Sequence, residues 1–341
     1  MNRRSFIPLF GTALLGASCL SVNEEAAKNL LARGIKFPKK LKVGDTIGIA
    51  APAGPIRDRS EVTGFIDVLH KLGFKTKVAP HTYGQFGFFS ATDEVRGTEF
   101  MELMKDETID GIFFIRGGWG CARILEYLDF DAIEKNPKVI MGFSDITTLL
   151  NAISAKTGLV TFHGPSGNST WNDYSLKYLK DVLMHGKSVL FSNQKGLDLD
   201  IVTYSGGLAS GDLYGGNLSV ICGLVGSEYL PDWRGKILFL EDVMEEPYRI
   251  DRMLTQLKLA GVFNQVSGIV LGNFRKCGAE EPDRSFTLEE VFEQHFSSSK
   301  VPVFYGAQIG HVRNKFTVPV GIRVSINADL GTIEMSEPSV Q

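Results

Sequence analysis

Strand-like apolar segments alternate with helix-like segments through the first half of the chain, and this alternation limits the possible folds more than any other feature. The strand-like segments cover residues 45–51, 75–79, 109–115, 139–141 and 159–162. Apolar residues recur at helical spacing between them, in residues 59–72, 92–105, 121–127 and 145–155. Strands separated by helices form right-handed crossovers in a parallel sheet. We therefore predict an α/β fold whose parallel sheet is covered by helices on both faces.

The second half shows a different pattern. Residues 186–205 are rich in Gly, Ser, Asn, Gln and Asp, which is typical of a linker. Two further strands and a helix are expected after it, and residues 317–335 alternate apolar and polar residues as antiparallel strands do. We predict a first domain over residues 41–185 and a second, β-rich domain over residues 206–341.

The N-terminus has the layout of an export signal. Residues 1–18 contain two arginines, an apolar run and small residues before Cys19. Cys19 stands where a lipoprotein would be cleaved and lipidated. We expect residues 1–18 to be a signal peptide, residues 19–40 to be a tether, and the protein to be exported to the periplasm or cell envelope, with Cys19 as the candidate site of a lipid anchor. A cytosolic protein with an apolar N-terminus is the alternative.

Charge and cysteine spacing argue against several classes of protein. The formal net charge of the 341 residues is -3, so the chain lacks the basic surplus that nucleic-acid binding requires. Its four cysteines show no CxxC pair, and no cluster of potential ligands has metal-binding spacing. We expect no nucleic-acid partner, no metal and no cofactor.

One serine lies between a strand and a helix in the stretch VIMGFSDITT, residues 139–148. A nucleophile needs this position, with its oxygen on a sharp turn and backbone N–H groups nearby. GFSD, residues 142–145, resembles the G-x-S-x-G nucleophile turn, although Ile146 replaces the last glycine. The alternative is that Ser144 or Asp145 only caps the helix.

The other candidates also lie at predicted strand ends. RGGWG, residues 116–120 and here called the glycine loop, lets the backbone approach an oxyanion or a carboxylate. His163 and His311 each follow an apolar strand and are candidate general bases. Glu241 ends the strand of residues 235–241 and is the candidate carboxylate beside a histidine, with Asp242 as its rival.

Five short segments of the chain resemble motifs of the LD-carboxypeptidase family of serine peptidases, and they occur in the same order as in that family. They are RGGWG (116–120), GFSD (142–145), GGNL (215–218), LED (240–242) and GH (310–311), followed by VPVG (318–321). The resemblance covers about residues 41–337. It implies a Rossmann-like or flavodoxin-like first domain, a smaller β-rich second domain and an active site in the cleft between them.

The resemblance also assigns roles. It implies a catalytic triad of Ser144, Glu241 and His311, with an oxyanion hole formed by the backbone N–H groups of Gly118 and Asp145. A carboxypeptidase must hold the terminal carboxylate of its substrate, and we consider Arg116 for that role. The alternative is that Arg116 forms a salt bridge that braces the glycine loop.

The expected reaction is release of the C-terminal D-alanine from a peptidoglycan tetrapeptide, which makes a muropeptide the expected partner. One branch of the family hydrolyses a peptide-nucleotide antibiotic and confers immunity, so a related amide hydrolase is one alternative. A muropeptide-binding envelope protein without catalysis is another. Homodimers are common in the family and are possible here.

Overall fold

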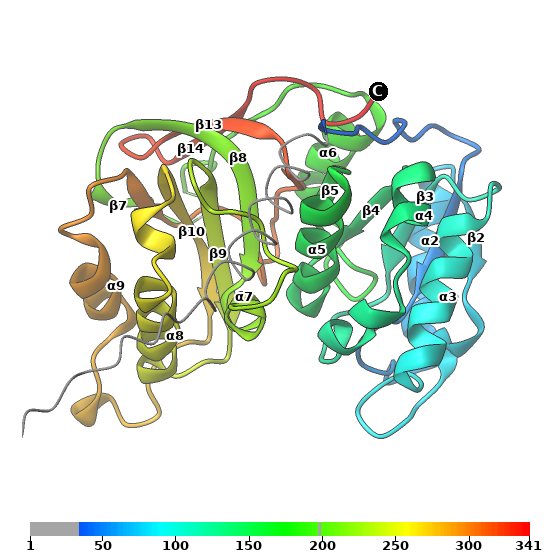
Figure 1. Cartoon of the computed structure of the whole chain (residues 1–341), viewed down its shortest axis with the longest axis horizontal. Coiled ribbons are helices and arrows are strands. Elements are labelled where there is room, and N and C mark those ends of the chain that lie inside the picture. The colour runs from blue at the N-terminus through cyan, green and yellow to red at the C-terminus, as the bar shows by residue number, and fades with distance from the viewer. Residues whose placement is uncertain (1–33, 197–198) are drawn as a thin grey trace, which may run out of the picture. The chain divides into compact units, whose positions relative to one another are not determined.

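A computed structural model describes residues 34–196 and 199–341 of the chain (Figure 1). The predicted signal peptide, Cys19 and the tether as far as residue 33 lie outside the described residues. Residues Ile35–Gln341 form one unit, which contains two sheets.

The first sheet has six strands in the order β12-β5-β4-β3-β1-β2. Their bounds are β1 (Thr46–Ala50), β2 (Lys75–Val78), β3 (Gly111–Phe114), β4 (Val139–Gly142), β5 (Thr161–His163) and β12 (Val318–Val320). The first five are parallel, and their order is that of flavodoxin-like folds. In such sheets ligands bind beyond the carboxyl ends of the strands, which is where the candidate residues of this half lie.

Helices cover both faces of the first sheet, as the apolar spacing predicts. They are α2 (Arg59–Lys71), α3 (Asp93–Lys105), α4 (Phe130–Lys135), α5 (Thr147–Thr157) and α6 (Asp173–Leu179). Apolar side chains of α2 and α6 belong to one buried cluster, and those of α3 and α5 belong to another. The two clusters lie on opposite faces of the first sheet, because side chains alternate between the faces of a strand, and the cluster that contains α2 continues into the second sheet.

Helix ends follow the sequence closely. Asp58 begins α2 with a capping box that it forms with Glu61, and the Thr92 hydroxyl accepts from the Val95 N–H at the start of α3. Residues Cys121–Tyr127 form a 3₁₀ helix, η2, where the sequence predicts an α-helix. The other short helices are η1 (Pro80–Tyr83), η3 (Ser144–Ile146), η4 (Lys180–Met184), η5 (Val262–Asn264) and η6 (Pro282–Arg284).

The second sheet has eight strands in the order β6-β14-β13-β8-β9-β10-β11-β7. Their bounds are β6 (Leu190–Phe191), β7 (Val202–Ser205), β8 (Leu208–Asn217), β9 (Ile237–Val243), β10 (Gly268–Arg275), β11 (Val303–Tyr305), β13 (Arg323–Asn327) and β14 (Thr332–Met335). Strands β8 to β11 are parallel, and the remaining pairs are antiparallel. The helices of this half are α7 (Leu218–Leu224), α8 (Pro247–Leu259) and α9 (Leu288–Phe296).

Two connections differ from a simple division into domains. Residues 186–205, which the sequence indicates as a linker, contain β6 and β7, and these strands pair with β14 and β11 at the two ends of the second sheet. Strand β12 belongs to the C-terminal segment but pairs antiparallel with β5 of the first sheet. Val318 and Val320 are buried there, so the first sheet is completed by residues far along the chain.

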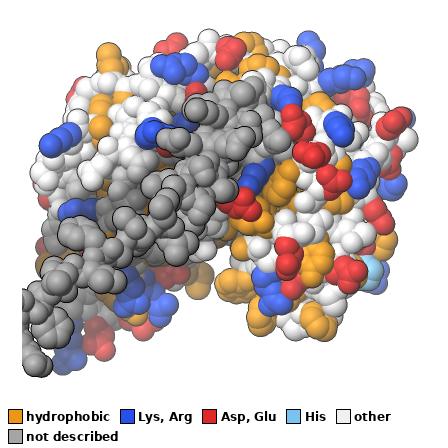
Figure 2. Space-filling model, in the orientation of Figure 1, with side chains coloured by type: hydrophobic (Ala, Val, Ile, Leu, Met, Phe, Trp, Pro, Cys, Tyr) orange, Lys and Arg blue, Asp and Glu red, His pale blue; other side chains and the backbone are white. Residues whose placement is uncertain are grey.

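The surface of the described residues carries both signs of charge. Figure 2 shows acidic and basic side chains interspersed on one face, with hydrophobic groups between them. Within residues 34–196 and 199–341, no helix has the length and apolar character that crossing a membrane requires.

Candidate active site

Ser144 is the first residue of the short helix η3, at the sharp turn that follows β4. Its φ angle of 64° is in the left-handed region that residues other than glycine rarely adopt. A Cβ on Gly142 would lie 2.9 Å from Ile146 and 3.0 Å from Phe114, so the turn needs glycine there. Strained backbone of this kind is concentrated at functional sites. The geometry is that of a nucleophile turn, and it forms without the last glycine of the motif.

Helix capping does not explain Ser144 or Asp145. Phe143 precedes η3 and Ile146 precedes α5 as the N-cap residues, and neither helix start has a side-chain capping bond. Asp145 instead accepts a hydrogen bond from the Cys121 N–H at 2.8 Å, which joins the turn to the end of the glycine loop. Burial raises the pKa of the Asp145 carboxyl.

The glycine loop packs directly against the Ser144 turn. A Cβ on Gly117 would lie 2.8 Å from the Ser144 Cβ and 3.2 Å from the Asp145 N, so a side chain at Gly117 would displace the serine. Gly118 has a φ angle of 132°, which favours glycine. Among the described residues, the N–H groups of Gly118 and Asp145 donate to no partner. Both groups are therefore free to receive an oxyanion beside the serine.

Arg116 is held by the backbone. Its Nη1 donates to the Pro55 carbonyl at 3.0 Å, while its buried Nε has no partner. No carboxylate of the described residues forms an ion pair with it, so the bracing salt bridge considered from the sequence is absent from this part of the chain.

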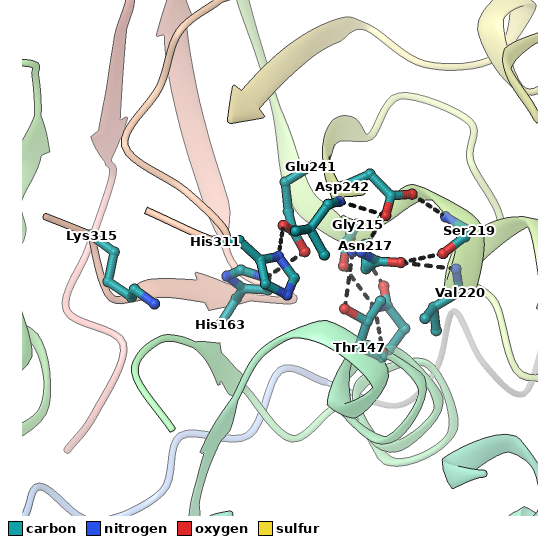
Figure 3. A network of polar contacts seen from close by, with 12 residues as sticks. Thr147, His163, Gly215, Asn217, Ser219, Val220, Glu241, Asp242, His311 and Lys315 are labelled. Atoms are coloured by element: carbon teal, nitrogen blue, oxygen red, sulfur yellow. Dashed lines mark hydrogen bonds and ion pairs between the residues drawn. The ribbon is translucent and has the colours of Figure 1, made fainter. Parts of the chain in front are cut away.

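Glu241 and His311 form a hydrogen-bonded pair in the second half of the molecule. The Glu241 Oε2 lies 2.7 Å from the His311 Nδ1, and the carboxylate is fully buried near the end of β9 (Figure 3). Burial disfavours the carboxylate's charge, but the two histidines beside it overcome this effect and lower the pKa of Glu241 to about 2. The carboxylate is therefore ionised at neutral pH and can orient the imidazole.

Asp242, the rival carboxylate, points to the other side of β9. It accepts from the Asn217 Nδ2 and from the Ser219 N–H, both at 2.9 Å (Figure 3). Burial and the charge of Glu241 raise the pKa of Asp242 to about 6. Its hydrogen bonds join β9 to the start of α7, so the structure gives Asp242 a supporting position.

His163, the rival histidine, lies behind the carboxylate at the end of β5. Its Nε2 is 3.9 Å from the Glu241 Oε1, and neither atom has a hydrogen-bond partner among the described residues. The ring packs edge-on against Phe143 and Phe239, and burial lowers the pKa of this histidine. Glu241 therefore lies between two imidazoles, of which only His311 is within hydrogen-bond distance.

The two halves of the site meet at Phe143 and Thr147. The Phe143 ring contacts the His311 ring with centroids 4.8 Å apart, and the Thr147 Oγ1 accepts from the Asn217 N–H at 3.0 Å. No hydrogen bond joins Ser144 to His311, and the His311 Nε2 is unpartnered within the described residues. Such bonds often tighten only when a substrate binds.

The GGNL segment at the end of β8 allows the first and second halves of the chain to pack closely together. Gly215 and Gly216 have φ angles of 141° and 140°, and a Cβ on either would collide with Phe239 or Thr147. The Asn151 Nδ2 donates to the Gly215 carbonyl at 2.8 Å. The two glycines stand out in the sequence as part of GGNL, whereas Asn151 and Thr147 look like ordinary helix residues and carry no signal of their own.

A surface hollow of about 700 Å³ is lined in part by Val312 and Arg313, the two residues after His311. Its lining comes from both halves of the chain, with Asn172, Asp173 and Tyr174 on one side and Asn273, Gln308 and Arg313 on the other. The hollow therefore lies where the two halves of the chain meet, beside the segment that follows His311 in sequence.

The site combines a serine on a strained turn, two free backbone donors and a buried carboxylate-imidazole pair. Hydrolases that work by acyl transfer use groups of these kinds. Models of the LD-carboxypeptidase N-terminal domain and C-terminal domain match residues 47–164 and 210–326. The chain belongs to the LD-carboxypeptidase family and is a hydrolase.

Its relatives include proteins from several bacteria. The probable murein peptide carboxypeptidase of Bacillus subtilis is 35% identical over 85% of this chain and 91% of its own length. The microcin C7 self-immunity protein MccF of Escherichia coli is 32% identical over 87% of this chain and 94% of its own length. The crystal structure of the muramoyltetrapeptide carboxypeptidase from Oxalobacter formigenes matches with a TM-score of 0.73 at 30% identity, over 85% of this chain and 97% of that one.

Proposed function

We propose that this protein is a serine LD-carboxypeptidase that releases the C-terminal D-alanine from peptidoglycan tetrapeptides. The observation that carries the proposal is the Glu241–His311 pair, which contacts Phe143 immediately before the strained Ser144. His311 thus packs against the residue next to Ser144, although the two positions are far apart in the chain. A protein that only binds muropeptides has no need of this arrangement.

In the proposed mechanism Ser144 is the nucleophile. Its oxygen attacks the carbonyl carbon of the terminal peptide bond, and the His311 Nε2 takes the hydroxyl proton. The Gly118 and Asp145 N–H groups stabilise the oxyanion that forms. His311 then gives the proton to the departing amine as the C–N bond breaks, and water hydrolyses the acyl-enzyme with His311 as base. Glu241 orients the imidazole and stabilises its cation throughout.

The names of the relatives support the substrate class. The Bacillus relative is named as a probable murein peptide carboxypeptidase, and the Oxalobacter structure is that of a muramoyltetrapeptide carboxypeptidase. A second candidate is hydrolysis of a peptide-nucleotide amide, as in an immunity protein, because the MccF relative is 32% identical over most of the chain. The two candidates share the proposed triad and differ in the group that leaves.

Release of D-alanine tests the proposal directly. The full chain is incubated with a tetrapeptide muropeptide, and free D-alanine is followed by mass spectrometry. We expect turnover by the native protein and none above background in Ser144→Ala. Binding without turnover would support the non-catalytic alternative, and cleavage of an aminoacyl sulfamoyl nucleoside in place of the muropeptide would support the immunity candidate.

We further propose that the protein is exported, acts on wall peptides in the envelope and carries a lipid anchor on Cys19. The support is the sequence of residues 1–19. Mass spectrometry of the protein from cells tests this: a mature chain starting at Cys19 with a diacylglycerol mass is expected. A chain that starts at Met1 contradicts export. Light scattering of the purified protein gives the oligomeric state.

A further inference from the structure

Lys315 is a buried cation without an acidic partner. The residue is 3% exposed, and no carboxylate of the described residues forms an ion pair with its ammonium group. Its hydrogen bond goes to the neutral Ser169 Oγ at 3.3 Å. Glu241 is the acidic group that interacts electrostatically with the Lys315 ammonium group, and its carboxylate is already hydrogen-bonded to His311. Buried charges are normally paired, so this ammonium group has capacity for an anion.

The ammonium group lies beside the proposed catalytic residues. The Lys315 Nζ is 4.0 Å from the centroid of the Phe143 ring, the same ring that contacts His311 and precedes Ser144. Figure 3 shows the Lys315 side chain directed toward His163 and His311. The anion that this site would take therefore lies within reach of the reacting groups.

Hydroxyl groups near Lys315 complete an anion site. The Ser169 Oγ accepts from Lys315 and from the Ser166 N–H at 3.0 Å, which leaves its own hydrogen free to donate. The buried Ser166 Oγ has no partner among the described residues. An ammonium group together with serine hydroxyls can satisfy both oxygens of a carboxylate.

We propose that Lys315 binds the terminal carboxylate of the substrate and so makes the enzyme a carboxypeptidase. This inference rests on the proposed function. His311 must deliver a proton to the amine of the departing amino acid, and the carboxylate of that amino acid is one carbon away from the amine. A cation on the same loop as His311, four residues later, is placed to hold it.

Two other cations near the site are weaker candidates. Arg116 already donates to the Pro55 carbonyl, and Arg313 lines the open hollow with its side chain exposed to solvent. An exposed guanidinium remains hydrated and gains less from binding an anion than a buried ammonium group does. Both arginines serve as matched comparisons for Lys315.

The test compares two substrates that differ only at the C-terminus: a tetrapeptide ending in D-alanine and the same peptide ending in D-alanine amide. We expect the native protein to prefer the free acid. Lys315→Met should lower kcat/KM for the acid by about 10- to 100-fold, the effect of losing one charge-assisted bond. The amide should lose much less, so that the acid-to-amide ratio falls toward one. Lys315→Arg should keep part of the preference.

Other outcomes would overturn the inference. An unchanged ratio in Lys315→Met, or an equal loss for both substrates, would make Lys315 a structural residue. If the acid-to-amide ratio of kcat/KM falls toward one in Arg116→Met or Arg313→Met but not in Lys315→Met, that arginine binds the carboxylate instead of Lys315. Thermal unfolding of each variant excludes a folding defect, which we do not expect because an apolar replacement for a buried charge is often tolerated.

Binding separates this inference from the proposed function. Ser144→Ala is titrated calorimetrically with the acid and the amide peptides, and Ser144→Ala combined with Lys315→Met is titrated in the same way. Tighter binding of the acid that is lost with Lys315 supports the carboxylate site even if the native protein turns over neither peptide. Equal binding of both peptides to Ser144→Ala contradicts the site even if D-alanine is released.

Discussion

The nucleophile side and the base side of this site are built in different ways. Ser144 and the glycine loop lie at the carboxyl ends of the neighbouring strands β4 and β3, and Asp145 joins them with one hydrogen bond. Glu241 and His311 come from different segments of the second half; the His311 ring contacts Phe143, the neighbour of Ser144, and Gly216 permits the two halves to pack closely at Thr147. The first side depends on local backbone geometry. The second depends on packing between distant parts of the chain.

If the two sides act as one unit, removing either should cost about as much as removing both. We expect Ser144→Ala and His311→Ala each to lower kcat by about 10⁴- to 10⁶-fold, and the double variant to be no worse. D-alanine release under single-turnover conditions measures the three rates. Ser285→Ala, a half-buried serine directly after η6, is the control. Additive losses would mean that the serine and the histidine do not share one step.

Variants of the two adjacent carboxylates of β9 should distinguish a residue that orients the imidazole from one that stabilises the fold. Glu241→Gln should lower kcat by about 10²- to 10⁴-fold, because the imidazole loses the anion that fixes its tautomer. Asp242→Asn should instead lower the free energy of unfolding by about 1 to 3 kcal/mol, since three hydrogen-bond donors face this carboxylate. Steady-state kinetics and urea unfolding measure the two effects. If Asp242→Asn lowers kcat more than Glu241→Gln does, then Asp242, and not Glu241, orients the imidazole.

The local side can be disturbed without touching a candidate catalytic group. Gly117→Ala places a methyl group 2.9 Å from the Ser144 Oγ, and we expect kcat to fall by about 10- to 100-fold because the nucleophile is displaced. Gly223→Ala in α7 meets no atom within 4 Å and should leave kcat unchanged. Activity equal to the native level in Gly117→Ala would show that the serine adjusts freely.

The smallest expected effect concerns pH on the base side. Burial lowers the pKa of Lys315 to about 8, with Glu241 opposing the shift and Arg275 adding to it. A lowered pKa means that the ammonium group loses its proton as pH rises through about 8, and with it the attraction for a carboxylate. We expect the acid-to-amide ratio of kcat/KM to be constant below pH 7 and to fall above pH 8. The amide substrate reports any pH effect of His311 and Glu241 separately. A ratio that is flat to pH 10 would contradict the assignment.

The same contrast explains which features could be predicted from the sequence. Strand and helix periodicity gives the parallel first sheet, its crossover helices and the cap at Thr92, because these depend on residues close in sequence. The placement of Ser144 on a turn follows from the strand-turn-helix pattern. The family model matches over both halves agree with the resemblance drawn from five short segments.

Features that depend on distant contacts could not be predicted in this way. The return of β12 to the first sheet is not visible in the alternation of residues 317–335, because an edge strand has the same pattern in either sheet. The choice between Glu241 and Asp242 turns on which face of β9 each occupies, and only the contacts of the second half decide it. Lys315 has no local signal, since a single lysine beside Asn314 looks like a surface residue until the fold buries it.

The pairing of β5 with β12 has a consequence for protein synthesis. The first sheet has an open edge until residue 320 has left the ribosome, and its edge strand carries His163 opposite Val318. A chain released before residue 311 would hold a strained serine without His311 and without the strand that pairs with β5. If His311 acts with Ser144 as proposed, such an early-terminated product is inactive, and its unpaired β5 is a strand edge that proteases can recognise.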